Sequence, residues 1–189
     1  MKKINIYSKI LIDKVKNHLE IKDGLLTLIE QAEGFPVIVD SDHIKTNITK
    51  CDFENNNDFK RPWVNNKMIE SLMTTSMHPM IHELGFEGFH LHTIWFQQYD
   101  KGSLHGWHSH NQSYVGIYYL DMPENSPMTE IYDGEKIISL NVEEGDMTIF
   151  PSYIIHRAPE SMIDKKKTII SFNLWFGEIL NKTIEGMYV

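Results

Sequence analysis

The sequence has one cysteine, Cys51, among its 189 residues. A lone cysteine cannot form a disulfide within the chain or supply the several thiolates of a structural metal cluster. Long apolar runs are also missing, since none approaches the roughly 20 residues that cross a bilayer. The N-terminal segment is basic, but Lys and Asp interrupt its apolar residues, unlike the continuous core of a signal peptide. From these absences we expect a soluble, cytoplasmic protein without a membrane partner.

Positive charge is scarce, and arginine is scarcer than lysine. The formal net charge is −8 and the sequence pI is about 5.6. Binding to the phosphates of DNA or RNA needs a basic face, so nucleic acid is disfavoured as a partner. Arg61 and Arg157 are the only arginines, which leaves few residues able to clamp a carboxylate or phosphate with two parallel hydrogen bonds. A lysine in a special sequence context is therefore informative in this chain.

The length favours one domain with a substantial core. We expect a single domain over residues 1–189, in which residues 1–87 form a supporting region of helices and strand and residues 88–178 form the β core. Apolar spacing and capping residues predict an opening strand within 3–12 and helices at about 13–20, 24–32 (capped by Asp23) and 66–84, the last divided at Pro79. Residues 40–58 are predicted to be loop with at most one short strand.

Strand patterns dominate the second half of the chain. Residues 89–99, FHLHTIWFQQY, alternate well enough for one long strand. Further strands are predicted at 113–121, 128–132, 136–141, 146–151 and 166–176. Their short, regular spacing, with Gly, Pro and Asn between them, favours an antiparallel barrel or jelly roll over alternating β/α units. Helices from the first half would pack against one sheet.

Two segments that are distant in sequence carry histidines suited to one metal ion. The first, YDKGSLHGWHSH (residues 99–110), places His108 and His110 two residues apart, so both point to one side of a strand or strand end. The second, GDMTIFPSYIIH, ends on His156. Neutral imidazoles suit Fe(II), Zn(II), Cu and Ni, and three protein ligands leave coordination positions open. We therefore predict a metal site of His108, His110 and His156.

Two other histidine pairs lack this context. His90 and His92 repeat the i, i+2 spacing, but no remote histidine with a matching turn accompanies them. His78 and His82 lie one helical turn apart, a spacing that can bind zinc, but the glutamate of the metalloprotease motif is absent. We expect neither pair to bind a metal.

Together these segments resemble the 2-oxoglutarate- and Fe(II)-dependent oxygenases. The shared pattern is Tyr99-x-x-Gly, the histidine pair, a strand like IYYLD, a Gly-Asp-x-x-x-Phe-Pro turn that ends in His156, and a basic residue about ten positions later. It spans roughly residues 94–176 and is most similar to a small phage and marine bacterial branch with H-x-H, FPS…H and SFN. The resemblance implies a mainly β fold with flanking helices, a double-stranded β-helix of the jelly-roll, cupin-like kind.

The same resemblance implies the activity and its cofactors. Fe(II) and 2-oxoglutarate would bind, the cosubstrate would be decarboxylated to succinate, and a C–H bond of a second substrate would be oxidised, as in a hydroxylase. That substrate is unspecified, a small molecule or a peptide, and a homo-oligomer remains open.

Residue roles follow from the resemblance. Lys167 occupies the position of the basic residue that pairs with the distal carboxylate of 2-oxoglutarate, and a charged hydrogen bond suits that task. Tyr119 would donate to the same carboxylate, and Tyr99 opens the turn. Alternation places Ser171 and Asn173 on the same face as Lys167. His105, Trp107 and Arg157 are weaker candidates that would orient ligands or line the opening. In the plainer interpretation, Lys165, Lys166 and Lys167 form a solvated turn and the tyrosines are core.

One position departs from the family pattern, because His110 stands where the family has a carboxylate ligand. His110 either completes a three-histidine site or turns away and leaves its place to water or substrate. Two other functions stay open. A cupin-like metalloenzyme without 2-oxoglutarate would share the histidines, but it expects a glutamate where Tyr114 and Val115 stand. A jelly-roll binding or structural module would keep the histidines without catalysis.

Overall fold

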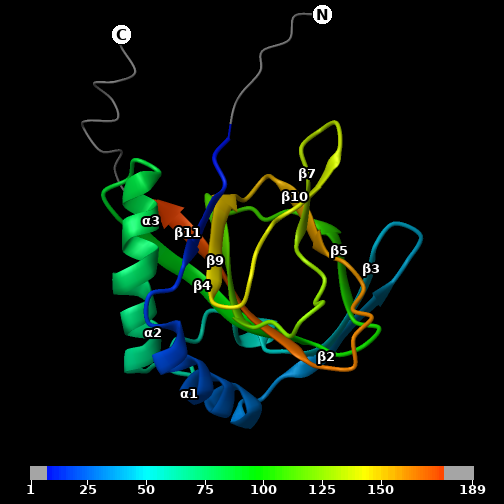
Figure 1. The fold of residues 1–189 in the computed structure, drawn as a ribbon, viewed down its shortest axis with the longest axis horizontal. Helices are drawn as coiled ribbons and strands as arrows, with labels where there is room; N and C mark the ends of the chain where they lie inside the picture. Colours follow the sequence, from blue (N-terminus) through cyan, green and yellow to red (C-terminus); the bar gives the residue numbers. More distant parts are fainter. Residues whose placement is uncertain (1–7, 177–189) are drawn as a thin grey trace, which may run out of the picture.

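The structure, a computed structural model, describes residues 8–176. Antiparallel strands dominate them and form an 11-stranded sheet that curls around the centre of the molecule (Figure 1). The strand order is β1-β9-β6-β11-β4-β3-β5-β10-β7-β8, and β2 pairs with β3 at the side. The strands are β1 (Leu11–Lys14), β2 (Phe35–Asp40), β3 (Lys45–Cys51), β4 (Phe89–Tyr99), β5 (Leu104–His108), β6 (Tyr114–Asp121), β7 (Glu130–Tyr132), β8 (Ile137–Ser139), β9 (Asp146–Pro151), β10 (Ile155–Ala158) and β11 (Lys167–Phe176).

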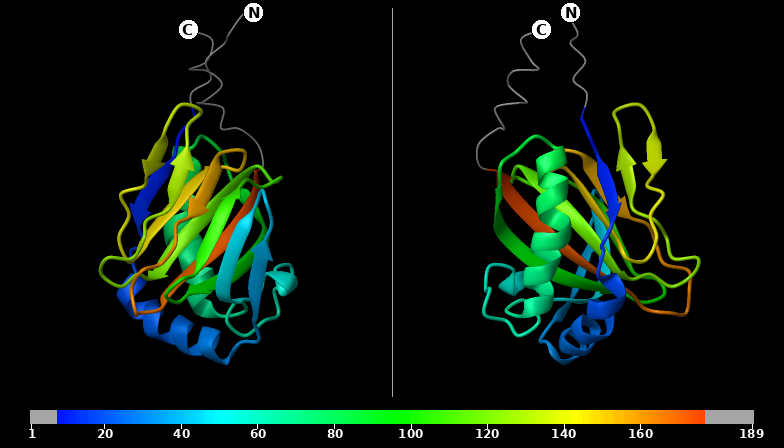
Figure 2. Two further views of the ribbon diagram at one scale, coloured as in Figure 1. Left: turned by 90° about the vertical axis from the view of Figure 1, so that its right-hand side faces the viewer. Right: turned by 60° about the vertical axis from the view of Figure 1, so that its left-hand side comes forward.

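Helices cover one outer face of the curled sheet, as Figure 2 shows. They are α1 (His18–Gln31), α2 (Lys67–Leu72) and α3 (His78–Glu83), with a π-helical segment (Met73–Met77) between the last two. Pro79 lies in the first turn of α3, where its missing N–H costs least. The predicted helix at 66–84 and its division near Pro79 are therefore confirmed, as is the mainly β fold with flanking helices.

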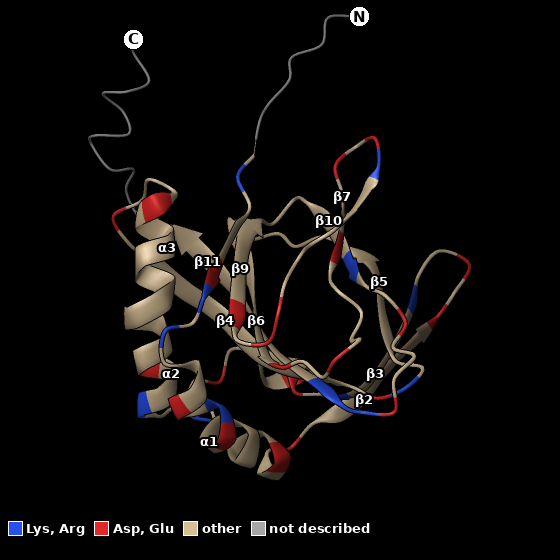
Figure 3. Ribbon diagram, viewed as in Figure 1, with Lys and Arg blue, Asp and Glu red and all other residues tan. Residues whose placement is uncertain are grey.

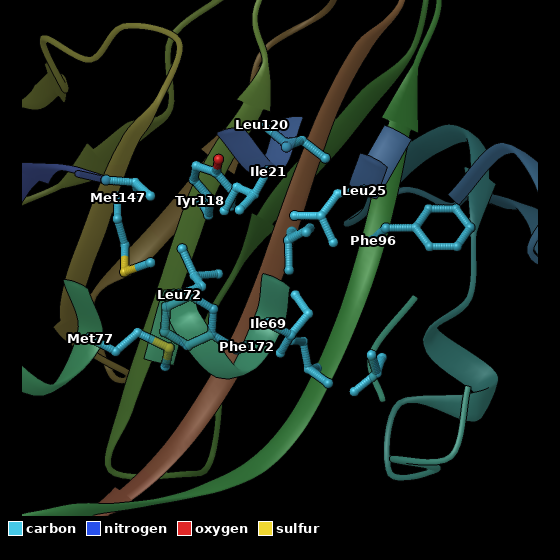
Figure 4. Packing of buried hydrophobic residues seen from close by; sticks show 14 of the residues in the cluster. Ile21, Leu25, Ile69, Leu72, Met77, Phe96, Tyr118, Leu120, Met147 and Phe172 are labelled. Atoms are coloured by element: carbon cyan, nitrogen blue, oxygen red, sulfur yellow. The ribbon is translucent and has the colours of Figure 1, made fainter. Parts of the chain in front are cut away.

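Alternation along the strands sends side chains to two separate cores. In β6, Tyr118 and Leu120 face the helices, whereas Ile117 and Tyr119 face the inside of the curled sheet. The helix side buries apolar residues spaced three to four apart on α1 (Ile21, Leu25) and α2 (Ile69, Leu72), and Figure 4 shows them with Phe96 of β4 and Phe172 of β11. Burying one such side chain contributes about 1.5–3 kcal/mol. The inner face is left for the site.

Close packing on the helix side requires a glycine in β6. A Cβ built on Gly116 would lie 2.1 Å from ring atoms of Phe172 in β11. Such a distance is far inside van der Waals contact, so any larger residue would displace the ring or separate the strands. Gly116 thus lets β6 and β11 pair while Phe172 stays fully buried.

The N-terminal prediction was partly wrong. A single helix runs from His18 through Asp23 and Gly24 to Gln31, in place of two helices with Asp23 as a cap. The reason is that Ile21, Leu25 and Ile29 form one continuous buried stripe against the sheet. Residues 11–14, assigned partly to a helix, instead form β1, in which Asp13 and Lys14 pair with β9. Of the predicted opening strand, residues 3–7 lie outside the described residues.

Strand β3 is the one short strand that the prediction allowed within residues 40–58, and β2, which pairs with it, was not predicted. Apolar and polar residues do not alternate clearly in either strand. Most side chains of β2 are exposed, and β3 has the largely polar sequence KTNITKC. Lys and Arg are scattered over loops, helices and strand ends and are not gathered on one element (Figure 3). No helix within residues 8–176 is long and apolar enough to span a membrane.

Candidate active site

Three histidines converge on the inner face of the curled sheet. His108 is the last residue of β5 and lies directly across from His156 of β10 in the antiparallel register. His110 follows β5, and its backbone N–H donates to Ser152 O at 2.9 Å, which ties it to the end of β9. One ligand atom from each of the three lies within 4.8 Å of the others. Pairing of β5 with β10 therefore unites residues that are 48 positions apart in sequence.

Backbone carbonyls orient two of the rings. His108 Nδ1 donates to Gly106 O at 2.8 Å, and His156 Nδ1 donates to Ile154 O at 2.9 Å. A carbonyl only accepts, so both rings carry their proton on Nδ1 and keep the Nε2 lone pair free. This is the arrangement in which metal-binding histidines are usually held.

The three imidazoles are neutral at physiological pH. Burial lowers the pKa of His108 and of His156, the latter well below its usual value, and burial with the nearby His108 lowers the pKa of His110 to about 4. His110 Nε2 is buried and has no hydrogen-bond partner among the described residues. Neutral rings, free lone pairs and an unsatisfied buried nitrogen suit a divalent metal such as Fe(II).

A fourth histidine is packed against the cluster. The His105 ring is stacked on that of His108, with centroids 3.8 Å apart. Ser171 Oγ donates to Gln97 Oε1 at 2.9 Å, and Gln97 Nε2 lies 3.3 Å from His105 Nδ1. Since the Gln97 amide nitrogen only donates, His105 Nδ1 accepts and its proton is on Nε2. Sequence reasoning missed Gln97, because a glutamine within a long strand carries no motif.

Lys167 is the unusual charge of the site. Its side chain is buried, its Nζ donates to Pro127 O at 2.6 Å, and Nζ lies 5.6 Å from the centre of the Tyr119 ring. Burial alone lowers the pKa of Lys167 to about 8, and no carboxylate of the described residues forms an ion pair with it. An ammonium buried without a counterion is costly unless a ligand supplies the negative charge.

Lys167 and the histidines line one inner cavity. Its walls include Lys167, Tyr99 and Ser171 together with His108, His110 and His156. The cavity is narrow, about 30 Å³, and shares Trp95, Gln97 and His105 with a larger pocket of about 540 Å³. The structure thus brings a cationic end and a cluster of metal-ligand type into one space.

The other predicted residues lie close to this space. Tyr99 and Tyr119 are fully buried, and the Tyr119 hydroxyl donates to Thr129 Oγ1 at 2.8 Å. Asn173 lines the larger pocket and donates from Nδ2 to Thr93 Oγ1 at 2.8 Å. Arg157 lies over the Trp107 ring, and Trp107 is turned away from both cavities.

No carboxylate replaces the missing family ligand within the described chain. Glu130 accepts from Arg157 Nε at 2.7 Å, and Asp121 pairs with Lys22 at 2.8 Å. Asp133 accepts backbone N–H groups in the β7–β8 turn. The only group of three or more metal-ligand side chains found in residues 8–176 is the histidine cluster. His92, from the second pair, packs instead against Trp175.

Comparison with models of protein families and with curated protein sequences gives no match. Solved structures do match. An oxidoreductase of the 2OG-Fe(II) oxygenase family from Burkholderia pseudomallei aligns with a TM-score of 0.71 at 10% identity, over 92% of this chain and 88% of that one. A prolyl hydroxylase from Trichoplax adhaerens, in complex with a hypoxia inducible factor peptide fragment, aligns with a TM-score of 0.62 at 14% identity, over 95% and 87%.

A viral collagen prolyl hydroxylase from Paramecium Bursaria Chlorella virus-1, in complex with 2OG, aligns with a TM-score of 0.56 at 10% identity, over 89% of this chain and 96% of that one. Identities this low speak for the fold alone. They confirm the double-stranded β-helix that the motifs implied. The chain has the jelly-roll fold of the 2-oxoglutarate- and Fe(II)-dependent oxygenases.

Proposed function

We propose that this protein is an Fe(II)- and 2-oxoglutarate-dependent oxygenase that hydroxylates a second substrate. One observation carries the proposal: the buried ammonium of Lys167, without a carboxylate partner among the described residues, lines the same cavity as three converging neutral histidines. Converging neutral imidazoles suit a divalent metal, and a buried ammonium suits an anion. The shared fold supports this assignment.

The roles are divided between the two ends of the cavity. His108, His110 and His156 would hold Fe(II), since their buried nitrogens are neutral and converge. Three neutral ligands leave the full charge of the ion, which favours an anionic cosubstrate. Lys167 would bind the distal carboxylate of 2-oxoglutarate after exchanging its bond to Pro127 O, with Tyr119 beneath the ammonium. Tyr99, Ser171 and Asn173 would complete the walls.

The overall reaction balances with these cofactors. 2-Oxoglutarate, O₂ and a substrate C–H bond give succinate, CO₂ and a substrate hydroxyl. One oxygen atom of O₂ enters the succinate and the other enters the hydroxyl group, and 2-oxoglutarate and the C–H bond each supply two electrons. Bound iron supplies the O₂ chemistry, while the chain holds the reactants and excludes water from a cavity of buried side chains.

Lys167 separates this proposal from the alternatives. A cupin-like metalloenzyme without 2-oxoglutarate has a use for the histidines but none for a buried ammonium. A structural module needs neither the converging histidines nor the buried ammonium. Because an unpaired buried charge lowers stability, its presence favours a function that uses an anion.

The test is anaerobic reconstitution with Fe(II), followed by titration with 2-oxoglutarate. We expect about one Fe(II) per chain by elemental analysis, a visible charge-transfer band when 2-oxoglutarate is added, and slow succinate formation when air is admitted. His156→Ala should lose the metal and the band. Metal without the band or succinate would favour the cupin-like enzyme, and undiminished metal binding by His156→Ala would refute the ligand set.

Partners and location remain predictions. A substrate partner fits the proposal, and the negative net charge disfavours nucleic acid.

A further inference from the structure

The larger pocket beside the histidine cluster has no charged lining. Its volume is about 540 Å³, in the range of small-molecule sites. No Asp, Glu, Lys or Arg lines it. The lining residues are Val37, Ile48, Cys51, Phe53, Asn56, Thr93, Trp95, Gln97, His105, His108, Ser109, His110, Asn111, Gln112 and Asn173.

The titratable side chains of this pocket are neutral as well. Burial raises the pKa of Cys51 to about 12, so the thiol stays protonated. His105 Nδ1 accepts from Gln97 Nε2 at 3.3 Å, which a doubly protonated and therefore charged imidazole could not do. The pocket wall itself therefore offers no ion to pair with a charged substrate near neutral pH.

Apolar and amide groups make up the rest of the wall. Trp95 and Phe53 meet edge to face with centroids 5.1 Å apart, and Val37 and Ile48 add aliphatic surface from β2 and β3. The amide of Gln97 is already bonded to Ser171 and His105. Four further amide side chains offer both donors and acceptors: those of Asn56, Asn111, Gln112 and Asn173. Such surfaces suit a flat or aliphatic body that carries neutral polar groups.

From this contrast with the Lys167 cavity we infer the substrate class. The substrate presents to the histidine cluster an uncharged group with an apolar face and amide- or hydroxyl-type hydrogen bonding. The inference rests on the proposed function for the identity of the pocket as a substrate site. A carboxylate or ammonium placed there would lose its hydration without gaining a partner from the wall, which disfavours charged substrates. The anionic cosubstrate is directed to Lys167 instead.

The experiment uses matched probes with one phenyl body: phenylacetamide, phenylacetate and phenethylammonium. Binding is followed by NMR through the indole N–H signal of Trp95, assigned with Trp95→Phe. The protein is titrated loaded with Zn(II) and 2-oxoglutarate, and again without either. We expect phenylacetamide to bind at least about tenfold more tightly than both charged probes in each state. N-acetylphenylalanine amide, a capped residue, extends the series, and its rank against phenylacetamide separates a peptide segment from a free small molecule.

A nearly isosteric variant provides the control. Asn56 is half-buried in the wall, and Asn56→Asp adds one carboxylate to the pocket. This variant should bind phenethylammonium about tenfold more tightly than the unmodified protein does. Equal affinities for the three probes, or no response to either neutral probe, would overturn the inference. Failure of the metal or 2-oxoglutarate to bind would instead count against the proposed function, because the unloaded protein still tests the pocket.

Discussion

The ammonium of Lys167 is held by the carbonyl oxygen of Pro127, at 2.6 Å, and by no carboxylate of the described residues. Lys167 opens β11, whereas Pro127 lies in the loop between β6 and β7, so the bond joins the inner cavity to that loop. One hydrogen bond to a neutral acceptor leaves the other two N–H groups and the positive charge available to an anion.

Lys167→Ala should weaken 2-oxoglutarate binding by about tenfold to a hundredfold, the effect of losing a charged hydrogen bond worth roughly 1.5–3 kcal/mol. Fe(II) binding should be retained, because the histidines are untouched. Calorimetry of both ligands measures this. Lys166→Ala is the matched control, since Lys166 pairs with Glu30 at the surface and should leave the affinity unchanged. Equal affinity of the unmodified protein and Lys167→Ala for 2-oxoglutarate would place the carboxylate partner elsewhere.

Affinity for 2-oxoglutarate should fall as pH rises through about 8. The pKa of Lys167 without an anion is lowered to about 8 by burial, so the side chain is charged below that pH and neutral above it. Above the pKa, anion binding must also take up a proton, which costs up to about tenfold in affinity per pH unit. Calorimetry from neutral to mildly alkaline pH measures the slope. A flat profile would show that the charge of Lys167 is not used.

His110→Ala should lower metal affinity by about tenfold or more, whereas His110→Asp should keep iron by restoring two histidines and a carboxylate. Both expectations follow from the convergence of His110 with His108 and His156. Competition with a metal-sensitive dye measures the affinities. If His110 is a bystander, both variants will bind metal as the unmodified protein does, and water or substrate would take its coordination position.

Asp52→Ala should reduce the free energy of unfolding by about 3–5 kcal/mol. The buried carboxylate accepts from Arg61, from Trp63 Nε1 at 2.8 Å and from Phe96 N at 2.8 Å. Its removal leaves three buried donors without an acceptor. Burial raises the pKa of Asp52 although Arg61 lowers it, so the ion pair with Arg61 is not strongly favourable. The loss of stability therefore comes from the hydrogen-bond donors left without an acceptor.

Urea denaturation measures that loss, and Asp164→Ala is its control. Asp164 pairs with Lys101 at 2.9 Å on the surface, so its loss should change stability by less than about 1 kcal/mol. Similar effects of the two substitutions would show that the partners of Asp52 find water or other acceptors.

Local sequence determined much of the second half of the fold. The strand-forming residues and turn signals are visible in the printed sequence, and β4, β6, β7, β8, β9 and β11 lie within a few residues of the predicted bounds, whereas β5 and β10 were not predicted as separate strands. The division of the helical region near Pro79 was equally readable, since proline lacks the backbone donor. The site residues His108, His110, His156 and Lys167 could be nominated from spacing and from a resemblance.

Only the tertiary structure decided how the less regular parts fold. Helix α1 is continuous through Gly24 because its buried stripe meets the sheet, a contact that outweighs the cap offered by Asp23. Strand β3 has weak alternation and exists because β2, β4 and β5 supply its backbone partners.

The chemistry of the site divides in the same way. Residue types and spacing along the chain determined which side chains could bind a metal or an anion. Strand pairing alone decided that His156 lies across from His108, that Gln97 reaches His105, and that Lys167 is buried without a carboxylate among the described residues. The physical reason is that pKa, tautomer and unmet charge depend on burial and on partners distant in sequence, which local patterns do not encode.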